Sequence, residues 1–230
     1  MENARKTILF SVILIIVLII SAFVTSHVTR NLLDEDASAD LLLANCFYEE
    51  KTLLPDDWFF GNEYRIFGQL IWAPFFGVFE NWGTVRLCGT LTIQLLFLLS
   101  FIFMMRSAFL KTNTILLGCV LLLIPYCVSY GRIVLYHNYY TLYITFSFLI
   151  LGFVFRLSRN FPKTGSKPIC ILQWILFAVT CFFSGLSGIR ELYIFLGPFC
   201  ALVFWQLIIF RRKRFLFSAL FSFEIGRAHV

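Results

Sequence analysis

The chain has 230 residues, of which 60% are hydrophobic, and it carries a formal net charge of +6 and a mean hydropathy of +0.84. A soluble domain is only about half apolar, and this chain has too few polar residues to cover one apolar core, so a water-soluble globular protein is excluded. The basic residues lie in short clusters between apolar runs and not on one continuous basic face, which argues against nucleic acid as a partner.

Six apolar runs approach the roughly 20 residues that are needed to cross the hydrocarbon core of a membrane. The first runs from about Thr7 to Thr25 and follows Arg5 and Lys6. Because no clear small-residue cleavage site follows it, we expect an uncleaved signal anchor. The other runs lie at about Leu87 to Met105, Thr114 to Tyr130, Asn138 to Phe155, Ile169 to Leu186 and Leu192 to Phe210. The sequence therefore predicts an all-α fold, a polytopic transmembrane helical bundle of about six spans.

The basic clusters select one orientation for these spans, because cytoplasmic loops carry an excess of Lys and Arg. With the N-terminus in the cytoplasm, the clusters at 106–111, 156–167 and 211–214 all lie inside. A long first loop, at about 26–86, then lies outside with short interfacial helices, as do turns near 131–137 and 185–191. We expect a multi-pass protein of the bacterial plasma membrane, and the RRKR run at its last cytoplasmic flank is suited to binding anionic membrane lipids.

The cysteines and the C-terminal residues bear on possible disulfide or zinc sites and on the extent of the domain. The seven cysteines lie mostly in apolar runs without a CxxC pair, so they predict neither a disulfide framework nor a zinc site. The last residues, Ile225 to Val230, match the translation of a common sequencing-adapter oligonucleotide. We therefore expect residues 1–224 to be a truncated transmembrane domain, and residues 225–230 to be an adapter-derived tail.

A cluster of three acids, Asp34, Glu35 and Asp36, follows the first apolar run, and ten of the thirteen acids lie between Asp34 and Glu80. Helix capping by Asp36 or Ser38 would explain one acid. Three adjacent carboxylates repel one another, so capping alone does not explain the cluster. At the outer membrane surface, a carboxylate can meet a substrate whose tail lies in lipid. We therefore favour a functional role for these acids.

The acids and the helix expected after them resemble the first external loop of membrane glycosyltransferases of the GT-C fold. Bacterial lipid A aminoarabinose transferases and protein O-mannosyltransferases are such enzymes. The matching residues are Asp34, Glu35, Ala39, Asp40, Leu41 and Ala44, followed by PDDWFFGNEYR at Pro55 to Arg65 and IWAPFFG at Ile71 to Gly77. The resemblance extends from the N-terminus to about Phe210, and its individual motifs are short.

The resemblance implies inverting transfer of a sugar from a polyprenyl-phosphate donor to a hydroxyl of a lipid, glycan or protein acceptor, outside the cytoplasm. A loop carboxylate would act as the general base, because attack on an anomeric carbon requires removal of the hydroxyl proton. In the family pattern the base matches Asp34. Asp36 remains a rival, because the third acid makes the register of the Asp-Glu pair ambiguous.

Further substrate-binding candidates lie in the external segments. Glu63 either orients a substrate or is an ordinary solvated acid. In YGRIVLYHNYY the tyrosines suit the membrane interface, whereas Arg132 can form a fork onto phosphate oxygens, and His137 either assists or is structural. Arg190, in GLSGIRELYIFLGP, either forms an exposed pair with Glu191 at a helix start or binds the lipid phosphate. It is the first choice for the phosphate, because GT-C transferases often keep a basic residue at a comparable turn.

Cofactor use and two other functions stay open at this point. Carboxylates can hold a divalent cation, although several relatives work without one. A transporter or flippase for lipid-linked sugars is the main alternative, but such proteins bury polar groups near mid-membrane, and these spans contain few ionisable residues. A non-catalytic membrane subunit is the second alternative.

Overall fold

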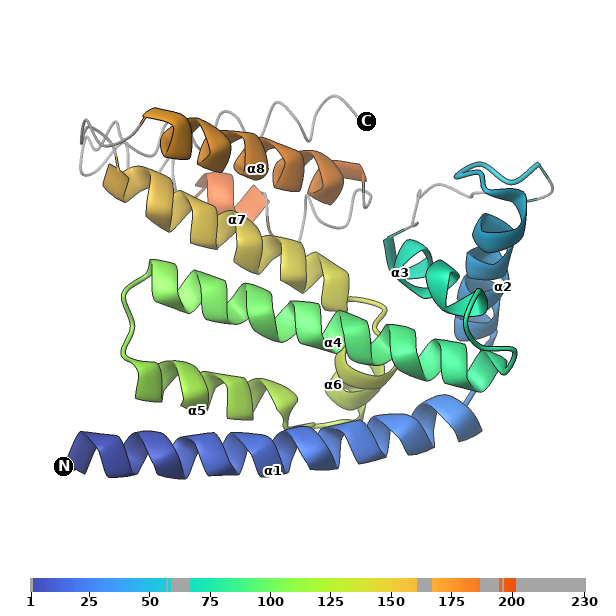
Figure 1. Ribbon diagram of the computed structural model, residues 1–230, viewed down its shortest axis with the longest axis horizontal. Coiled ribbons are helices and arrows are strands. Elements are labelled where there is room, and N and C mark those ends of the chain that lie inside the picture. The colour runs from blue at the N-terminus through green and yellow to red at the C-terminus, as the bar shows by residue number, and fades with distance from the viewer. Residues whose placement is uncertain are drawn as a thin grey trace. The chain divides into compact units, whose positions relative to one another are not determined.

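The chain consists mainly of helices joined by short links in a computed structural model, which describes residues 2–56, 58, 67–160, 167–186, 195 and 197–201 (Figure 1). The elements are α1 (Glu2–Asn31), α2 (Glu35–Glu50), α3 (Phe67–Phe76), α4 (Trp82–Ser107), α5 (Thr112–Leu123), α6 (Val128–Tyr130), the π-helix η1 (Gly131–Tyr136), α7 (Thr141–Asn160) and α8 (Lys167–Leu186). These residues include no strand, which confirms the all-α expectation for them.

The chain forms two compact units. The first unit comprises residues 1–60, 66–102 and 110–142, and it contains every described residue of the candidate site. The second unit comprises residues 61–65, 103–109 and 143–230.

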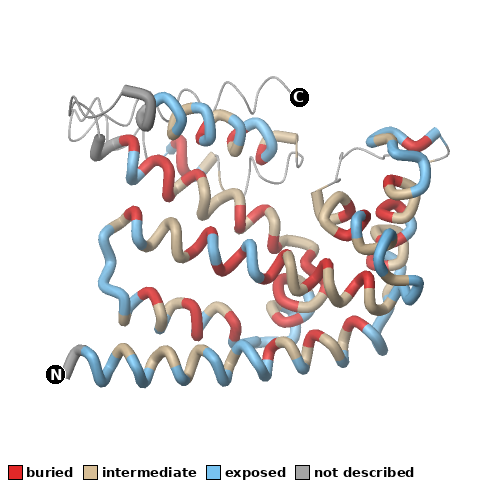
Figure 2. The backbone as a smooth tube through the Cα atoms, in the orientation of Figure 1, coloured by how far each residue is buried: buried red, intermediate tan, exposed pale blue. Residues whose placement is uncertain are grey.

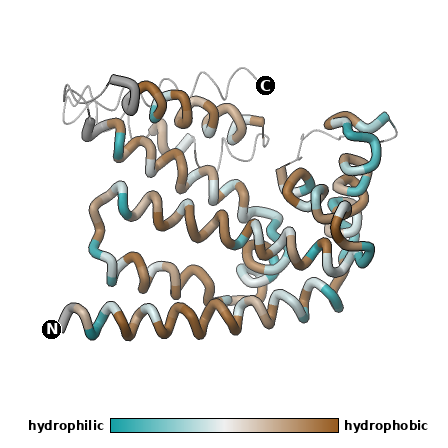
Figure 3. Tube along the Cα trace, viewed as in Figure 1, coloured by the Kyte–Doolittle hydropathy of each residue, from teal (hydrophilic) through white to brown (hydrophobic). Residues whose placement is uncertain are grey.

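The first helix is long, apolar and little buried. Its stretch Ala4–Asn31 reaches a mean hydropathy of 3.1 over its most apolar window, of which only 6% is buried (Figures 2 and 3). α1 packs along α5, where the hydroxyl of Thr7 donates to the side-chain oxygen of Asn113 at 2.7 Å. Exposed apolar surface of this extent is unfavourable in water and suits contact with hydrocarbon. α1 therefore has the properties of a membrane-spanning helix.

Two of the described helices, α1 and α4, are long and apolar enough to cross a membrane. A third crossing is possible if α5 and the helical segment Val128–Tyr136 together form one broken span. α7 and α8 contain shorter apolar stretches, 141–157 and 171–186. The chain thus has the helices of a membrane protein, while six spans and an external first loop remain predictions.

The expected third span, 114–130, is not one continuous helix. α5 ends at Leu123, and the next residue, Ile124, is extended with φ −86° and ψ 122° because it precedes Pro125. The helical path resumes at Val128 with a bend of 95°. The turn expected near 131–137 is also different, because residues 131–136 form the π-helix η1.

In the first unit, α2 and α3 pack together over the beginning of α4. The core of this packing consists of buried apolar side chains from the three helices: Leu41, Ala44, Trp72, Val85 and Ile93. Gly89 permits it, since a Cβ atom at this position would lie 1.9 Å from Cδ1 of Trp72. A hydrogen bond of 2.6 Å from Gln69 to Asp40 joins α3 to α2. Short helices in this region were expected, and α2 and α3 pack against each other.

The second unit has its own apolar core between α7 and α8. Its buried members include Ile150, Phe153, Val154, Phe177 and Cys181. The ring of Phe103 lies 5.0 Å from that of Phe153, centroid to centroid.

Candidate functional site

Asp34 is placed by the short link 32–34 between α1 and α2. Its backbone is extended (φ −101°, ψ 175°), and its Oδ1 accepts a hydrogen bond from the backbone N–H of Ala37 at 2.9 Å. Asp34 is therefore the N-cap of α2. The expected cap at Asp36 or Ser38 is wrong because α2 begins earlier, at Glu35. The hydroxyl of Ser38 donates instead to the backbone carbonyl of Asp34 at 2.8 Å.

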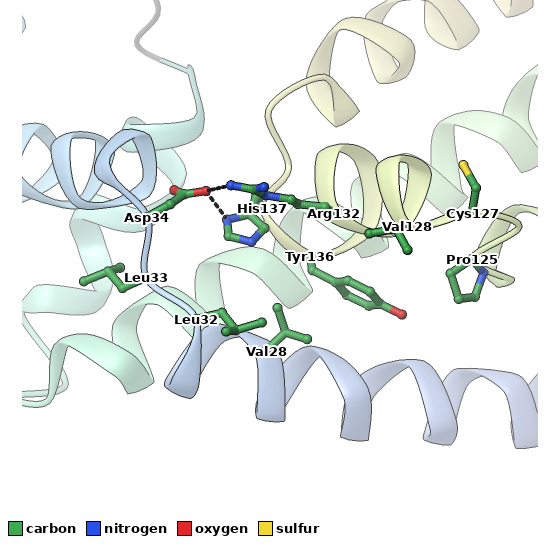
Figure 4. A pocket seen from close by; sticks show the side chains of 11 residues that line it. Val28, Leu32, Leu33, Asp34, Pro125, Cys127, Val128, Arg132, Tyr136 and His137 are labelled. Atoms are coloured by element: carbon green, nitrogen blue, oxygen red, sulfur yellow. Dashed lines mark hydrogen bonds and ion pairs between the residues drawn. The ribbon is translucent and has the colours of Figure 1, made fainter.

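The carboxylate of Asp34 also has partners from η1 and the segment after it. Nη2 of Arg132 lies 2.8 Å from Oδ2, and Nδ1 of His137 lies 3.5 Å from the same oxygen (Figure 4). The hydroxyl of Tyr139 donates to Oδ1 at 2.5 Å. Asp34 and Arg132 are 98 residues apart in the chain. The structure thus brings together three of the residues that the sequence singled out: Asp34, Arg132 and His137.

The electrostatics of this cluster favour an ionised Asp34. Burial favours the neutral acid, but the hydrogen bonds from Arg132, Tyr139 and the Ala37 N–H outweigh it and hold the pKa of Asp34 well below its ordinary value. Burial and the hydrogen bond to Asp34 raise the pKa of Tyr139. At neutral pH the carboxylate is therefore charged, and Tyr139 is a neutral hydrogen-bond donor.

Arg86, near the beginning of α4, contacts both the end of α1 and His137. Its role was not predicted from the sequence. Its residue surface is only 1% exposed. Nη1 donates to the backbone carbonyls of Thr29 at 3.1 Å and Leu32 at 2.7 Å, and Nη2 lies 2.9 Å from Nδ1 of His137. The carbonyls at the end of α1 lack helical partners, and a cation there also complements the helix dipole. Arg86 therefore fixes the end of α1 from which Asp34 extends.

One signal in the sequence could have identified Arg86. It begins an apolar helix and has no acid three or four residues away on either side. An arginine in that position must find acceptors on other elements if it is buried.

The π-helix is held in place by buried hydrogen bonds. Nε2 of Gln94 donates to the carbonyl of Leu135 at 2.5 Å and to the hydroxyl of Thr25 at 3.0 Å, which joins α4, η1 and α1. The backbone N–H of His137 donates to the carbonyl of Arg132 at 2.9 Å, five residues earlier. π-Helical turns of this kind are rare and occur frequently at functional sites. Here the π-helical turn lets the side chains of Arg132 and His137 line one cavity.

This cavity has a volume of about 720 Å³ and combines apolar walls with a charged end. Its walls come from the end of α1 and from the bend between α5 and η1, and include Val28, Leu32, Pro125, Val128 and Tyr136 (Figure 4). Its polar lining includes Asp34, Arg132 and His137, the thiol of Cys127 and the hydroxyl of Tyr136. Such a lining matches an amphiphilic ligand with an apolar body and an anionic group that Arg132 can bind.

The other predicted residues do not enter the cluster. Glu35 and Asp36 are exposed in the first turn of α2, and neither forms a hydrogen bond or an ion pair with a described side chain. Glu63 and Arg190 lie outside the described residues. Of the three adjacent acids, only Asp34 lines the cavity, as far as the structure describes the chain.

The cluster does not match a site for a divalent cation. Within the described ranges, no three His, Cys, Asp or Glu side chains form a group that could hold a metal ion. Asp34 is the one carboxylate among the described cavity residues, and it already faces the cation of Arg132. A divalent cation there would be repelled by Arg132, so we derive no chemistry from a metal.

Comparison with known proteins found no match to a family, to a curated protein or to a solved structure. The interpretation of the site therefore rests on its own residues.

Proposed function

We propose that this chain is a membrane glycosyltransferase with a GT-C-like transmembrane domain. It would transfer a sugar from a polyprenyl-phosphate donor to an acceptor hydroxyl on the extracytoplasmic side. The observation that supports this most directly is the cavity of about 720 Å³, in which apolar walls lead to Arg132 beside Asp34. An isoprenoid chain would contact the walls, and the guanidinium of Arg132, whose side chain is 59% exposed, would bind the phosphate.

In this reaction the acceptor oxygen attacks the anomeric carbon, and the bond from that carbon to the phosphate oxygen breaks. The polyprenyl phosphate leaves with the electron pair, and Asp34 takes the hydroxyl proton. Arg132 would stabilise the charge that develops on the leaving phosphate.

Asp34 is a weak base while Arg132 and Tyr139 donate to it, because these bonds stabilise its charged form. The donor phosphate would compete for Arg132. Loss of that contact would raise the pKa of Asp34 toward its ordinary value and make the carboxylate a stronger base. Donor binding would thereby prepare the base that the acceptor needs.

The remaining parts of the proposal come from the sequence. Arg190 would bind the lipid phosphate together with Arg132, and Glu63 would orient the sugar or the acceptor. Six spans with a cytoplasmic N-terminus would place Asp34 and the long loop outside, which agrees with the positions of the basic clusters. The acceptor would be a lipid, a glycan or a protein.

The test compares Asp34→Asn with Asp36→Asn in proteoliposomes that contain the intact natural protein and a radiolabelled lipid-linked sugar. Asn is as good an N-cap as Asp, so Asp34→Asn should keep the cap of α2, and it removes the base together with the negative charge that faces Arg132. We expect transfer to fall by about 10²- to 10⁴-fold. Asp36→Asn is the matched control, and it should reduce sugar transfer much less because Asp36 does not line the cavity.

Two results would change this assignment. Near-normal transfer by Asp34→Asn with complete loss in Asp36→Asn would move the base to Asp36. Donor binding by the wild-type protein without any transfer would favour the alternative, a transporter or flippase for lipid-linked sugars.

A further inference from the structure

Arg86 and His137 form a buried contact that the proposed reaction does not yet use. Arg86 is 1% exposed and His137 is 5% exposed, and Nη2 of Arg86 lies 2.9 Å from Nδ1 of His137. A guanidinium stays protonated at any physiological pH and has only donors. Nδ1 of His137 must therefore accept this hydrogen bond, and it cannot carry a proton while it does so.

Four groups from four segments of the first unit surround the imidazole. Arg86 comes from α4 and Arg132 from η1, whereas Asp34 comes from the α1–α2 link, and the ring of Tyr139 stacks at 5.4 Å between centroids. Burial has the largest effect on the pKa of His137 and lowers it. The positive charges of Arg86 and, to a smaller extent, Arg132 lower it further. The charge of Asp34 opposes them without reversing the direction. His137 is therefore neutral at pH 7.

A neutral imidazole with an unprotonated Nδ1 carries its proton on Nε2. His137 lines the cavity, and its Nε2 has no hydrogen-bond partner in the described part of the chain. The Nε2–H group is thus a donor that a ligand in the cavity can use.

We infer that Arg86 is a positioning residue, which holds His137 as the Nε2–H tautomer so that His137 donates a hydrogen bond to an anionic oxygen of the ligand. The identity of that ligand, a phosphate on an isoprenoid chain, rests on the proposed function. The tautomer and the role of Arg86 rest on the contact between the two side chains alone. A neutral donor keeps its proton beside Arg132, where an imidazolium would be repelled.

The experiment uses the whole chain in lipid nanodiscs, with ¹⁵N-labelled histidine. Long-range proton–nitrogen spectra distinguish the two neutral tautomers from the imidazolium. The chain has three histidines, so His137→Gln assigns the signal. His27, whose Nδ1 lies 3.2 Å from the amide nitrogen of Asn31, is the internal reference. We expect His137 to be neutral and protonated at Nε2 at pH 7, and a wild-type spectrum with Nδ1–H or an imidazolium would overturn the inference.

Arg86→Met then tests whether the contact with Arg86 sets the tautomer of His137. Loss of the donor to Nδ1 leaves Asp34 as the neighbour at 3.5 Å, so the Nε2–H pattern should be lost and the titration midpoint of His137 should rise. Gln94→Met is the matched control, because it removes hydrogen bonds between α4, α1 and η1 but none to His137. An unchanged His137 spectrum in folded Arg86→Met, or the same change in Gln94→Met, would refute the positioning role.

A ligand titration separates this inference from the proposed function. Farnesyl phosphate should shift the His137 Nε2 signal, whereas farnesol, which lacks the phosphate, should not. If the wild-type tautomer is as expected but neither compound shifts the signal, the lipid-phosphate ligand and the proposed function are wrong, while the role of Arg86 stands.

Discussion

Asp34 combines a structural role with a chemical one. As the N-cap of α2 it satisfies the Ala37 N–H, and the same carboxylate faces Arg132 and Tyr139. An amide at this position would keep the cap and lose the negative charge. The two roles can therefore be separated by a single substitution, which is why Asp34→Asn is more informative than Asp34→Ala.

The hydrogen bond from Tyr139 to Asp34 gives a pH prediction. Tyr139→Phe removes a donor to the charged carboxylate, so the pKa of Asp34 should rise. If Asp34 is the base, activity is lost as it becomes protonated, and the acid limb of the kcat/KM profile should move to higher pH. The profile of kcat/KM reports the free enzyme, in which this bond is present.

The control for this change is Tyr126→Phe. It removes the same hydroxyl from a tyrosine that donates to the carbonyl of Leu121 and not to Asp34. The acid limb should stay in place in this variant. An acid limb that is unmoved in Tyr139→Phe would mean that Asp34 does not control the observed titration.

At the level of residues, the sequence predicted the chemical types in the cluster better than their contacts. Asp34, Arg132 and His137 were recognisable because charged groups beside apolar runs are unusual. Tyr139 was attributed to an aromatic belt, because the sequence does not show that its hydroxyl reaches an acid 105 residues away. Arg86 was missed for the same reason, since its acceptors come from α1 and from His137.

Among the elements, α3 depends on one glycine of α4. A Cβ atom at Gly89 would lie 1.9 Å from the indole of Trp72, so Gly89→Ala must displace this indole from its packing against α4. We expect a loss of about 1–3 kcal/mol, as for other overpacked sites, seen as a lower thermal unfolding temperature in detergent. Faster proteolysis of the loop that contains α3 should accompany it.

Gly68→Ala is the matched control for this prediction. Its Cβ atom would meet only Cδ1 of Leu142, at 3.9 Å, which is ordinary contact. Because Ala also favours the helix, this variant should be neutral or slightly more stable. Equal destabilisation by both substitutions would show that the packing of Trp72 on Gly89 is not the cause.

The elements themselves were only partly predictable. Apolar runs predict long helices well, and the helices after the first run were expected. The break between α5 and α6 follows from Pro125, whose effect on Ile124 is local and visible in the sequence. The π-helix η1 was not predictable, because its extra residue per turn is stabilised by contacts to Gln94 and Thr141 from other elements.

For the whole molecule, membrane topology is the property on which the proposed function depends. Glu50→Cys and Lys163→Cys, each in a background with the natural cysteines replaced by alanine, should respond differently to a membrane-impermeant maleimide. The first site, the exposed last residue of α2, should be labelled in intact cells. The second lies in the basic segment 156–167 and should be labelled only after permeabilisation. The reverse pattern would place Asp34 in the cytoplasm and contradict extracytoplasmic transfer.

The distance along the chain between Asp34 and its partners has a consequence for biosynthesis. Arg132 follows Asp34 by 98 residues and Tyr139 follows it by 105. At a synthesis rate of roughly 5–20 residues per second, these partners leave the ribosome roughly 5–20 s after the acid. During that interval the carboxylate at the end of α1 lacks these two partners. Substitutions that remove the Asp34–Arg132 ion pair should therefore leave the insertion of α1 unchanged and impair only the later association of η1 with it.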